Sequence, residues 1–277
     1  MYNRHKTWRF FYLTKYIKMK KAIILFHLFI TIVIFSQKKF DVVYEADYKL
    51  NYKLSNSNNF KKETTFALLI NENSSFFKDL RRYISDSLMV EKKLNTIEEA
   101  MKYNTDFRGY IGTTSAKLYV TDEINYSYFG YEEPNNTNWK IKNEFKTVAG
   151  YKCQKAETTK YGRTWIAWFA TEIPFPFGPY KFNGLPGLIA EVYDTKDDYH
   201  YTLYTFRKRK YTCKSANIAT NVKNLTKEKV AEVFKNRLAG KLRLNEQYIE
   251  NVEDREYMRR NAEEAIKNYN PIELSIY

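Results

Sequence analysis

The chain has 277 residues, of which 44% are hydrophobic and 17% aromatic, so wholesale disorder is excluded and one large domain, or at most two, is expected. Three His and two Cys leave too few ligands for a zinc finger, a His-rich metal site or a multi-disulfide scaffold. We therefore expect no metal and no cofactor.

The first segment of the chain has the pattern of a targeting sequence. Met19-Lys20-Lys21 precedes a mostly apolar stretch at 22–35, and Ser36 precedes a polar region. This order is typical of a cleaved secretory signal peptide, and the stretch is shorter than the roughly 20 residues of a membrane-spanning helix. We interpret residues 1–36 as an N-terminal extension plus signal peptide, with the true start at Met1 or Met19. The sequence then predicts an exported protein without a transmembrane anchor, located in the periplasm, at the outer membrane or in the medium.

The basic charge of the chain is concentrated in this segment. The formal net charge is +14, and residues 1–36 hold seven Lys and Arg and no acid, so residues 37–277 carry a net charge of +7. That balance suits a soluble protein or weak attraction to anionic lipid. For an exported protein it gives no reason to expect a nucleic-acid partner.

Alternating apolar and polar residues predict a β-rich fold. Eight segments show this pattern or are rich in strand-forming residues, with the turn Tyr161-Gly162 between two of them. These segments are 42–50, 64–70, 124–129, 139–145, 153–159, 163–170, 188–193 and 199–206. We predict an α+β fold that is mainly antiparallel β, either a single curved sheet or an open barrel, with a few helices packed on it.

Three helices are predicted around these strands. Residues 96–101 begin with a capping box. Residues 226–240 place apolar side chains at helical spacing and end at Gly240, and 258–269 give a C-terminal helix. No long linker separates these segments, so we expect one β-rich domain at 37–277 with a charged helical tail from about residue 241.

Residues 173–187 form a loop unlike the rest of the chain. It holds four of the six prolines and three of the nine glycines, which excludes a helix or a central strand. Pro186-Gly187 predicts a type II turn over 185–188. The aromatic side chains of the loop either plug one end of the sheet or form a rigid recognition surface. These side chains are Phe175, Phe177, Tyr180 and Phe182.

The end of this loop carries a motif that names a family. The motif comprises Gly184, Leu185, Pro186, Gly187, Leu188 and Ile189. With its ordered context over 139–194, it resembles the GLPGLI family, exported proteins of Gram-negative bacteria whose biochemical activity is unassigned. The resemblance implies export and a single β-rich domain, and it supplies no catalytic residue.

Two further pairs of residues have a functional and an ordinary interpretation. Cys153 and Cys213 are either one disulfide in an oxidising compartment or two buried thiols. Arg163 and Trp165 share one face of a predicted strand. An Arg stacked on an aromatic ring would bind a polar-headed ligand, whereas cross-strand packing is the ordinary alternative.

These observations favour an exported, non-enzymatic binding or accessory protein of the cell envelope. Its contact surface would be the loop 173–187, and its partner an apolar ligand or an outer-membrane protein. The alternative is an envelope hydrolase that uses carboxylates from Glu172, Glu191 or Asp194. A third hypothesis is a domain that only stabilises an outer-membrane complex.

Overall fold

The computed structural model describes residues 39–94, 96–214, 221–246 and 251–275. The predicted signal peptide lies outside the described residues. Residues Phe40–Tyr277 form one compact unit. Among the residues described, no helix is long and apolar enough to cross a membrane.

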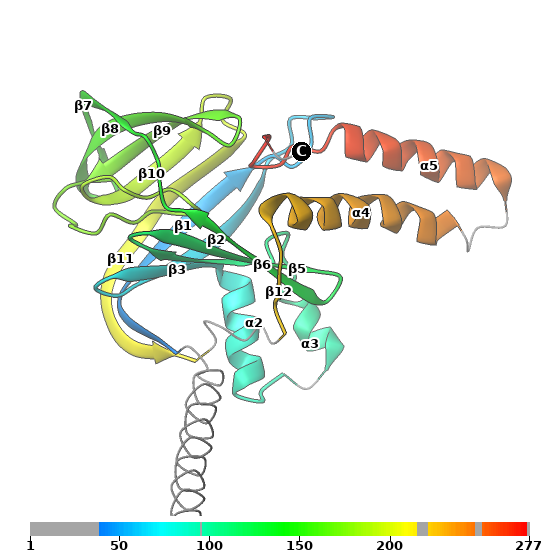
Figure 1. Ribbon diagram of the computed structural model, residues 1–277, viewed down its shortest axis with the longest axis horizontal. Coiled ribbons are helices and arrows are strands. Elements are labelled where there is room, and N and C mark those ends of the chain that lie inside the picture. Colours follow the sequence, from blue (N-terminus) through cyan, green and yellow to red (C-terminus); the bar gives the residue numbers. More distant parts are fainter. Residues whose placement is uncertain (1–38, 95, 215–220, 247–250, 276–277) are drawn as a thin grey trace, which may run out of the picture. The chain divides into compact units, whose positions relative to one another are not determined.

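One open, mainly antiparallel sheet contains all the strands of this unit (Figure 1). In chain order the strands are β1 (Phe40–Tyr52), β2 (Lys62–Ile70), β3 (Ser74–Asp79), β4 (Tyr110–Thr114), β5 (Lys117–Ile124), β6 (Ser127–Pro134), β7 (Lys140–Val148), β8 (Tyr151–Lys160), β9 (Arg163–Ala170), β10 (Leu188–Asp194), β11 (Tyr199–Cys213) and β12 (Lys223–Asn224). Their order across the sheet is β12-β6-β5-β4-β3-β2-β1-β11-β10-β9-β8-β7, and only β12 with β6 is parallel. The predicted fold class, in its form of a single curved sheet with a few helices, is confirmed.

Most of the predicted strands are present, and one needs correction. Tyr161 and Gly162 both have positive φ and join β8 to β9 in a two-residue hairpin turn, as predicted. The predicted strand 124–129 is wrong, because it spans the end of β5, a turn and the start of β6. Asn125 and Tyr126 both adopt positive φ in that turn.

The sheet has a different apolar cluster on each of its faces. On β1, Ala46, Tyr48 and Leu50 belong to the main core, whereas Val42 belongs to a smaller cluster. A register shift against β11 between Val42 and Tyr44 accompanies this change of face, and a second shift lies between Asp47 and Tyr48, within the main-core part of β1. Such bulges increase the local twist and bend of a sheet.

Helices cover both faces of the sheet (Figure 1). These are α2 (Leu80–Val90), α3 (Ile97–Met101), α4 (Lys227–Glu246) and α5 (Val252–Lys267). The Asp79 side chain caps α2 by accepting from the backbone N–H groups of Arg81 and Arg82. Leu80 and Tyr83 of α2 pack on the smaller cluster.

Helix α4 packs on β5 and β6, because Val230 joins Ile124 and Phe129 in a third cluster. The predicted stop at Gly240 is wrong, since α4 continues to Glu246. Helix α5 lies beside α4 (Figure 1) and is largely exposed. Charged helical structure from about residue 241 therefore comprises the second part of α4 and all of α5.

The chain then returns from α5 to the sheet. Ser55 forms a β-bridge with Tyr269, and the Leu274 backbone N–H donates to Tyr161 O at 2.8 Å. We call residues 268–275 the C-terminal segment. It connects the β1–β2 turn with the β8–β9 hairpin and so forms part of the boundary of the functional site.

Candidate functional site

The aromatic loop 173–187 is anchored in the core rather than raised above it. Phe177 and Phe182 are buried, and the Phe182 ring lies 4.6 Å from the Trp165 ring, centroid to centroid. Phe175 is half-buried, with its centroid 5.0 Å from that of Tyr44. Tyr180 is also half-buried and directs its hydroxyl to Glu273. The packing alternative therefore accounts for Phe177 and Phe182, whereas Tyr180 lies beside the polar cluster described below.

The six-residue motif shapes the end of this loop. Leu185, Leu188 and Ile189 are buried, and Pro186 is exposed. The predicted type II turn is not formed, because Gly187 has a φ of +158° rather than the roughly +80° of that turn, and the Leu188 N–H donates to Ile173 O at 3.0 Å. Instead the Gly187 N–H donates to Leu185 O at 2.8 Å, the two-residue spacing of a γ-turn.

The two glycines of the motif are needed for different physical reasons. Gly184 has a φ of +89°, a conformation that L-residues rarely adopt, and nothing lies within 4 Å of the place of a Cβ. A Cβ on Gly187 would lie 2.1 Å from Ala170 O. Gly187 therefore allows the loop to pass against the backbone at the end of β9.

Arg163 and Trp165 are buried and have protein partners. The Arg163 guanidinium pairs with Asp194 and Asp198, each at 3.0 Å, and donates to the Pro271 carbonyl at 2.8 Å. Trp165 Nε1 donates to Lys160 O at 3.0 Å. In this structure both side chains hold protein segments together, and Arg163 anchors the C-terminal segment.

The disulfide considered from the sequence is not formed. Cys153 and Cys213 are both buried, and neither is in a disulfide. Cys153 belongs to the main core and Cys213 to the smaller cluster beside α2. Burial raises the pKa of the Cys153 thiol to about 11.

The three carboxylates considered for hydrolysis occupy separate environments. Glu172 is exposed and accepts from the Lys152 backbone N–H. Glu191 contacts Lys146 and His200, and Asp194 is bound by Arg163. Burial alone would raise the pKa of Glu191, but the hydrogen bonds from His200 and Lys146 outweigh it and hold the pKa below its ordinary value. A paired carboxylate with a lowered pKa is a poor general acid at neutral pH.

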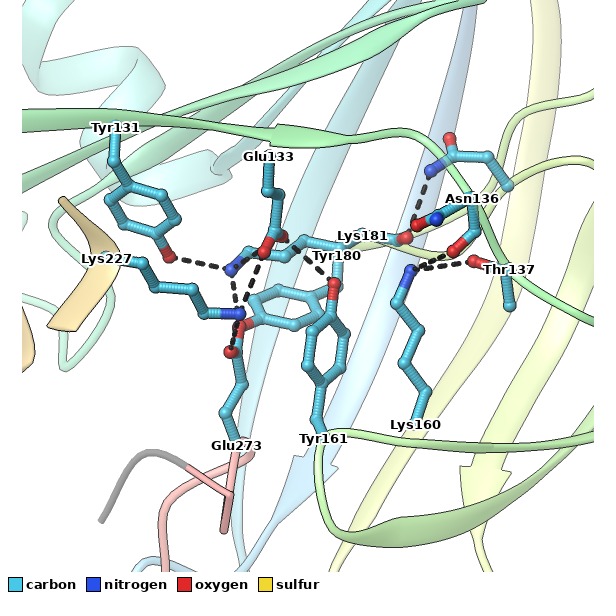
Figure 2. A network of polar contacts seen from close by, with 11 residues as sticks. Tyr131, Glu133, Asn136, Thr137, Lys160, Tyr161, Tyr180, Lys181, Lys227 and Glu273 are labelled. Atoms are coloured by element: carbon cyan, nitrogen blue, oxygen red, sulfur yellow. Dashed lines mark hydrogen bonds and ion pairs between the residues drawn. The ribbon is translucent and has the colours of Figure 1, made fainter.

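A cluster of two lysines and two glutamates, one of each buried and one of each half-buried, lies where α4, β6, the aromatic loop and the C-terminal segment meet (Figure 2). We call Glu133, Lys181, Lys227 and Glu273 the lysine–glutamate cluster. Lys181 contacts Glu273 directly and lies 3.1 Å from Glu133, and Lys227 lies 2.8 Å from Glu133 and 2.7 Å from Glu273. Its charges balance within the cluster.

Tyrosine hydroxyls complete the shell of this cluster (Figure 2). Lys181 donates to Tyr131 at 2.7 Å, Tyr161 donates to Glu133 at 3.0 Å, and Tyr180 donates to Glu273. Burial alone would raise the pKa of Glu273, but Lys181 and Lys227 outweigh it and lower the pKa. The cluster is therefore a closed ionic joint between loop, helix and C-terminal segment.

Lys160 lies beside the joint (Figure 2). Its ammonium donates to Thr137 Oγ1 at 2.8 Å and to Asn136 O at 3.1 Å. Burial lowers its pKa to about 8, because no carboxylate pairs with it directly among the described contacts.

A cavity of about 460 Å³ adjoins the lysine–glutamate cluster. Its walls come from β2 to β6, the residues before β4, β11, α4, the aromatic loop and the C-terminal segment. The apolar and aromatic lining includes Phe66, Phe77, Phe107, Tyr201, Val230 and Phe234. Tyr180 and Lys181 bring the aromatic loop into the wall. The cavity wall combines these aromatic and apolar side chains with a comparable share of polar and charged ones.

Asp122 lines this cavity without a partner. It follows Val120 and precedes Ile124 on the face of β5 that bears the cavity, and its side chain forms no hydrogen bond or ion pair with any described residue. Burial raises its pKa to about 6, with Lys181 lowering and Glu273 raising the value. The sequence analysis missed Asp122, although an acid among Leu118, Val120 and Ile124 on one strand face was a usable signal.

The comparisons with known proteins give a short family match and a shared fold. Residues 157–191, which include the motif at 184–189, match a family model described as "Protein of unknown function (Porph_ging)". No curated protein matches the sequence.

Two structures of PNGF-II, in its C2 and P21 space groups, are similar in fold, with TM-scores of 0.51 and 0.50 and 12% identity. Each similarity covers 71% of this chain, but only 33% and 34% of the PNGF-II chain. The chain thus spans about a third of those structures. At this identity the likeness shows the fold alone.

Proposed function

We propose that this chain is an exported, non-enzymatic binding protein of the cell envelope that holds a small ligand in the cavity beside α4. The observation that carries the proposal is the cavity itself, because about 460 Å³ of space lined by aromatic and charged side chains, with the Asp122 carboxylate paired by no described residue, has the size and the mixed chemistry of a ligand site. The signal-peptide pattern and the motif at 184–189 support export and a GLPGLI-type assignment.

Only one part of the aromatic loop 173–187 would contact the ligand. Phe177 and Phe182 fix the loop in the core, and Tyr180 and Lys181 then reach the cavity wall. The ligand contact surface is therefore smaller than the whole loop. A preformed wall of this kind loses little conformational entropy on binding.

A cavity-filling substitution tests the proposal. Ala231 is buried on α4 and lines the cavity, so Ala231→Trp should fill it. The matched control is Glu256→Trp on the exposed surface of α5. Both proteins and the wild type would be purified from the envelope fraction, examined by native mass spectrometry, and titrated with the apolar dye N-phenyl-1-naphthylamine.

The wild type and Glu256→Trp should carry additional mass or bind the dye, whereas Ala231→Trp should do neither at an unchanged circular dichroism spectrum. Equal binding by both variants, or a bare wild type that ignores the dye, would overturn the proposal. A protein recovered instead in a stable complex with an outer-membrane protein would favour the protein-partner alternative.

A further inference from the structure

The charges in the cavity wall leave one anion and one cation without partners. Eight charged residues line it, namely Asp106, Arg108, Asp122, Glu123, Lys181, Lys227, Arg237 and Glu273. Six of them have partners: Asp106 pairs with Lys62, Glu123 with Arg82 and Arg108, and Glu273 with Lys181 and Lys227. The side chains of Asp122 and Arg237 form no ion pair or hydrogen bond with any residue in the described part of the chain.

The surroundings of Asp122 explain why no protein cation reaches it. Its Oδ1 lies against the backbone of Gly109, where a Cβ would approach to 2.4 Å. Lys181 acts on Asp122 only through space, since its ammonium is bound by Tyr131 and two glutamates. A carboxylate held in this way has lost part of its hydration without gaining a cation from the described residues.

Arg237 approaches the same region from α4. The hydroxyl of Tyr269 lies within the electrostatic influence of both charges: burial, Asp122 and Asp106 raise its pKa, and Arg237 lowers it. Asp122 on β5 and Arg237 on α4 therefore line the same cavity from two elements, and both act electrostatically on Tyr269. Phe234, also on α4, has its ring centroid 5.7 Å from that of Tyr269.

We propose that the cavity binds a zwitterion with an apolar body, an apolar amino acid or short peptide, whose ammonium pairs with Asp122 and whose carboxylate pairs with Arg237. This inference rests on the proposed function and specifies its ligand. Each ligand charge supplies the counter-ion that its protein partner lacks, and the guanidinium can hold a carboxylate through two hydrogen bonds. The aromatic wall accepts the apolar side chains.

The test uses ligands of one shape that differ only in charge. The probes are the dipeptide Leu-Phe, its C-terminal amide, its N-acetyl form and the form blocked at both ends, with free phenylalanine as a shorter zwitterion. Binding to the full mature chain would be measured by isothermal titration calorimetry at pH 7.5. The variants are Asp122→Asn and Arg237→Gln, with Asp254→Asn and Arg259→Gln on the exposed surface of α5 as matched controls.

The wild type and both controls should bind Leu-Phe at least about tenfold more tightly than either singly blocked form, since each loses one buried ion pair. Asp122→Asn should abolish the preference for a free ammonium and keep the preference for a free carboxylate. Arg237→Gln should abolish the preference for a free carboxylate and keep the preference for a free ammonium. Relative affinities for phenylalanine and Leu-Phe distinguish a single amino acid from a peptide.

Two results would overturn the inference in different ways. If the doubly blocked dipeptide binds as well as Leu-Phe, the zwitterion inference fails while the proposed binding function stands. If no dipeptide form binds and the wild type also ignores N-phenyl-1-naphthylamine, both fail. Loss of binding by the α5 controls would show that the variants act through something other than the cavity.

Discussion

At the scale of single residues, Asp122 is a destabilising group in the wall of the cavity. It occupies an apolar strand face, and its pKa is raised to about 6 from 3.8 because burial disfavours the carboxylate. Lys181 of the aromatic loop lowers that value and Glu273 of the C-terminal segment raises it, and Asp122 in turn raises the pKa of Tyr269. A binding residue held at a cost in stability is a common compromise in functional sites.

The first prediction concerns the pH dependence of stability. The folded protein binds the Asp122 proton more tightly than the unfolded chain does, so stability falls as pH rises from about 4 to about 6 and the cost is then constant. Asp122→Asn should therefore raise the free energy of unfolding at pH 8 by on the order of 1 to 3 kcal/mol. Urea unfolding at pH 8.0 and 4.5 checks this.

The gain should largely disappear at pH 4.5. Asp47, whose pKa burial also raises to about 6, contributes equally to wild type and variant, so their difference isolates Asp122. An equal gain at both pH values would show that the substitution acts by packing rather than by charge.

The second prediction separates the two motif glycines. Gly184→Ala should cost about 1 to 2 kcal/mol, because only the positive φ is strained. Gly187→Ala should cost about 3 kcal/mol or more, or prevent folding, because its Cβ would meet a backbone oxygen that cannot yield. Urea unfolding and soluble yield measure the difference, and equal losses would contradict this account of the motif.

At the scale of elements, the C-terminal segment is bound at two polar joints. Arg163 holds it near Pro271, and the lysine–glutamate cluster holds it at Glu273. Asn270 and Glu273 are buried, so the segment is part of the domain boundary although the preceding α5 is exposed.

The third prediction is that Glu273→Gln loosens this segment. Lys181 and Lys227 would then share Glu133 alone, and an uncompensated buried charge typically costs about 3 to 5 kcal/mol. Because Lys181 and Lys227 lower the Glu273 pKa, this stabilisation is present at neutral pH and is lost as pH falls through that lowered value. Hydrogen exchange of residues 268–275 should accelerate in the variant.

Glu263→Gln, on the exposed surface of α5, is the control and should leave exchange in the C-terminal segment unchanged. If both variants exchange alike, the lysine–glutamate cluster does not hold the segment, and the Arg163 joint is the sufficient anchor.

At the scale of the whole unit, the sheet separates two interiors. The main core, the cavity and the lysine–glutamate cluster share one side, and the smaller cluster with α2 occupies the other. The two cysteines are divided between these clusters, which is why an even pair in the sequence does not become a disulfide.

The fourth prediction follows from this separation. The denatured protein should present two alkylatable thiols without prior reduction, and the native protein should resist iodoacetamide because both thiols are buried and the Cys153 pKa is about 11. Intact mass spectrometry with and without reductant checks it. A mass lowered by two hydrogens, together with a melting temperature that falls on reduction, would contradict the structure.

The sequence by itself was sufficient to predict strands with one buried and one exposed face, because apolar and polar residues alternate along such strands. Alternation predicted β1, and positive φ at Tyr161 and Gly162 matches the turn expected there. Alternation did not predict β3. Nearly every residue of this strand is buried, and Phe76 and Phe77 pack on opposite faces of the sheet, so apolar and polar residues do not alternate along it.

Only the tertiary structure decided the site. Arg163 and Lys181 are occupied by protein carboxylates, those of Asp194, Glu133 and Glu273, and so are not available to a ligand. These carboxylates are distant in sequence from the cations. The order of the strands and the return of the C-terminal segment bring them together. Local pattern fixes which face a side chain takes, whereas its charge partner is set by long-range packing. Asp122 and Arg237 became candidates for that reason, because the residues that the structure describes pair every other charge in the cavity wall and leave those two side chains.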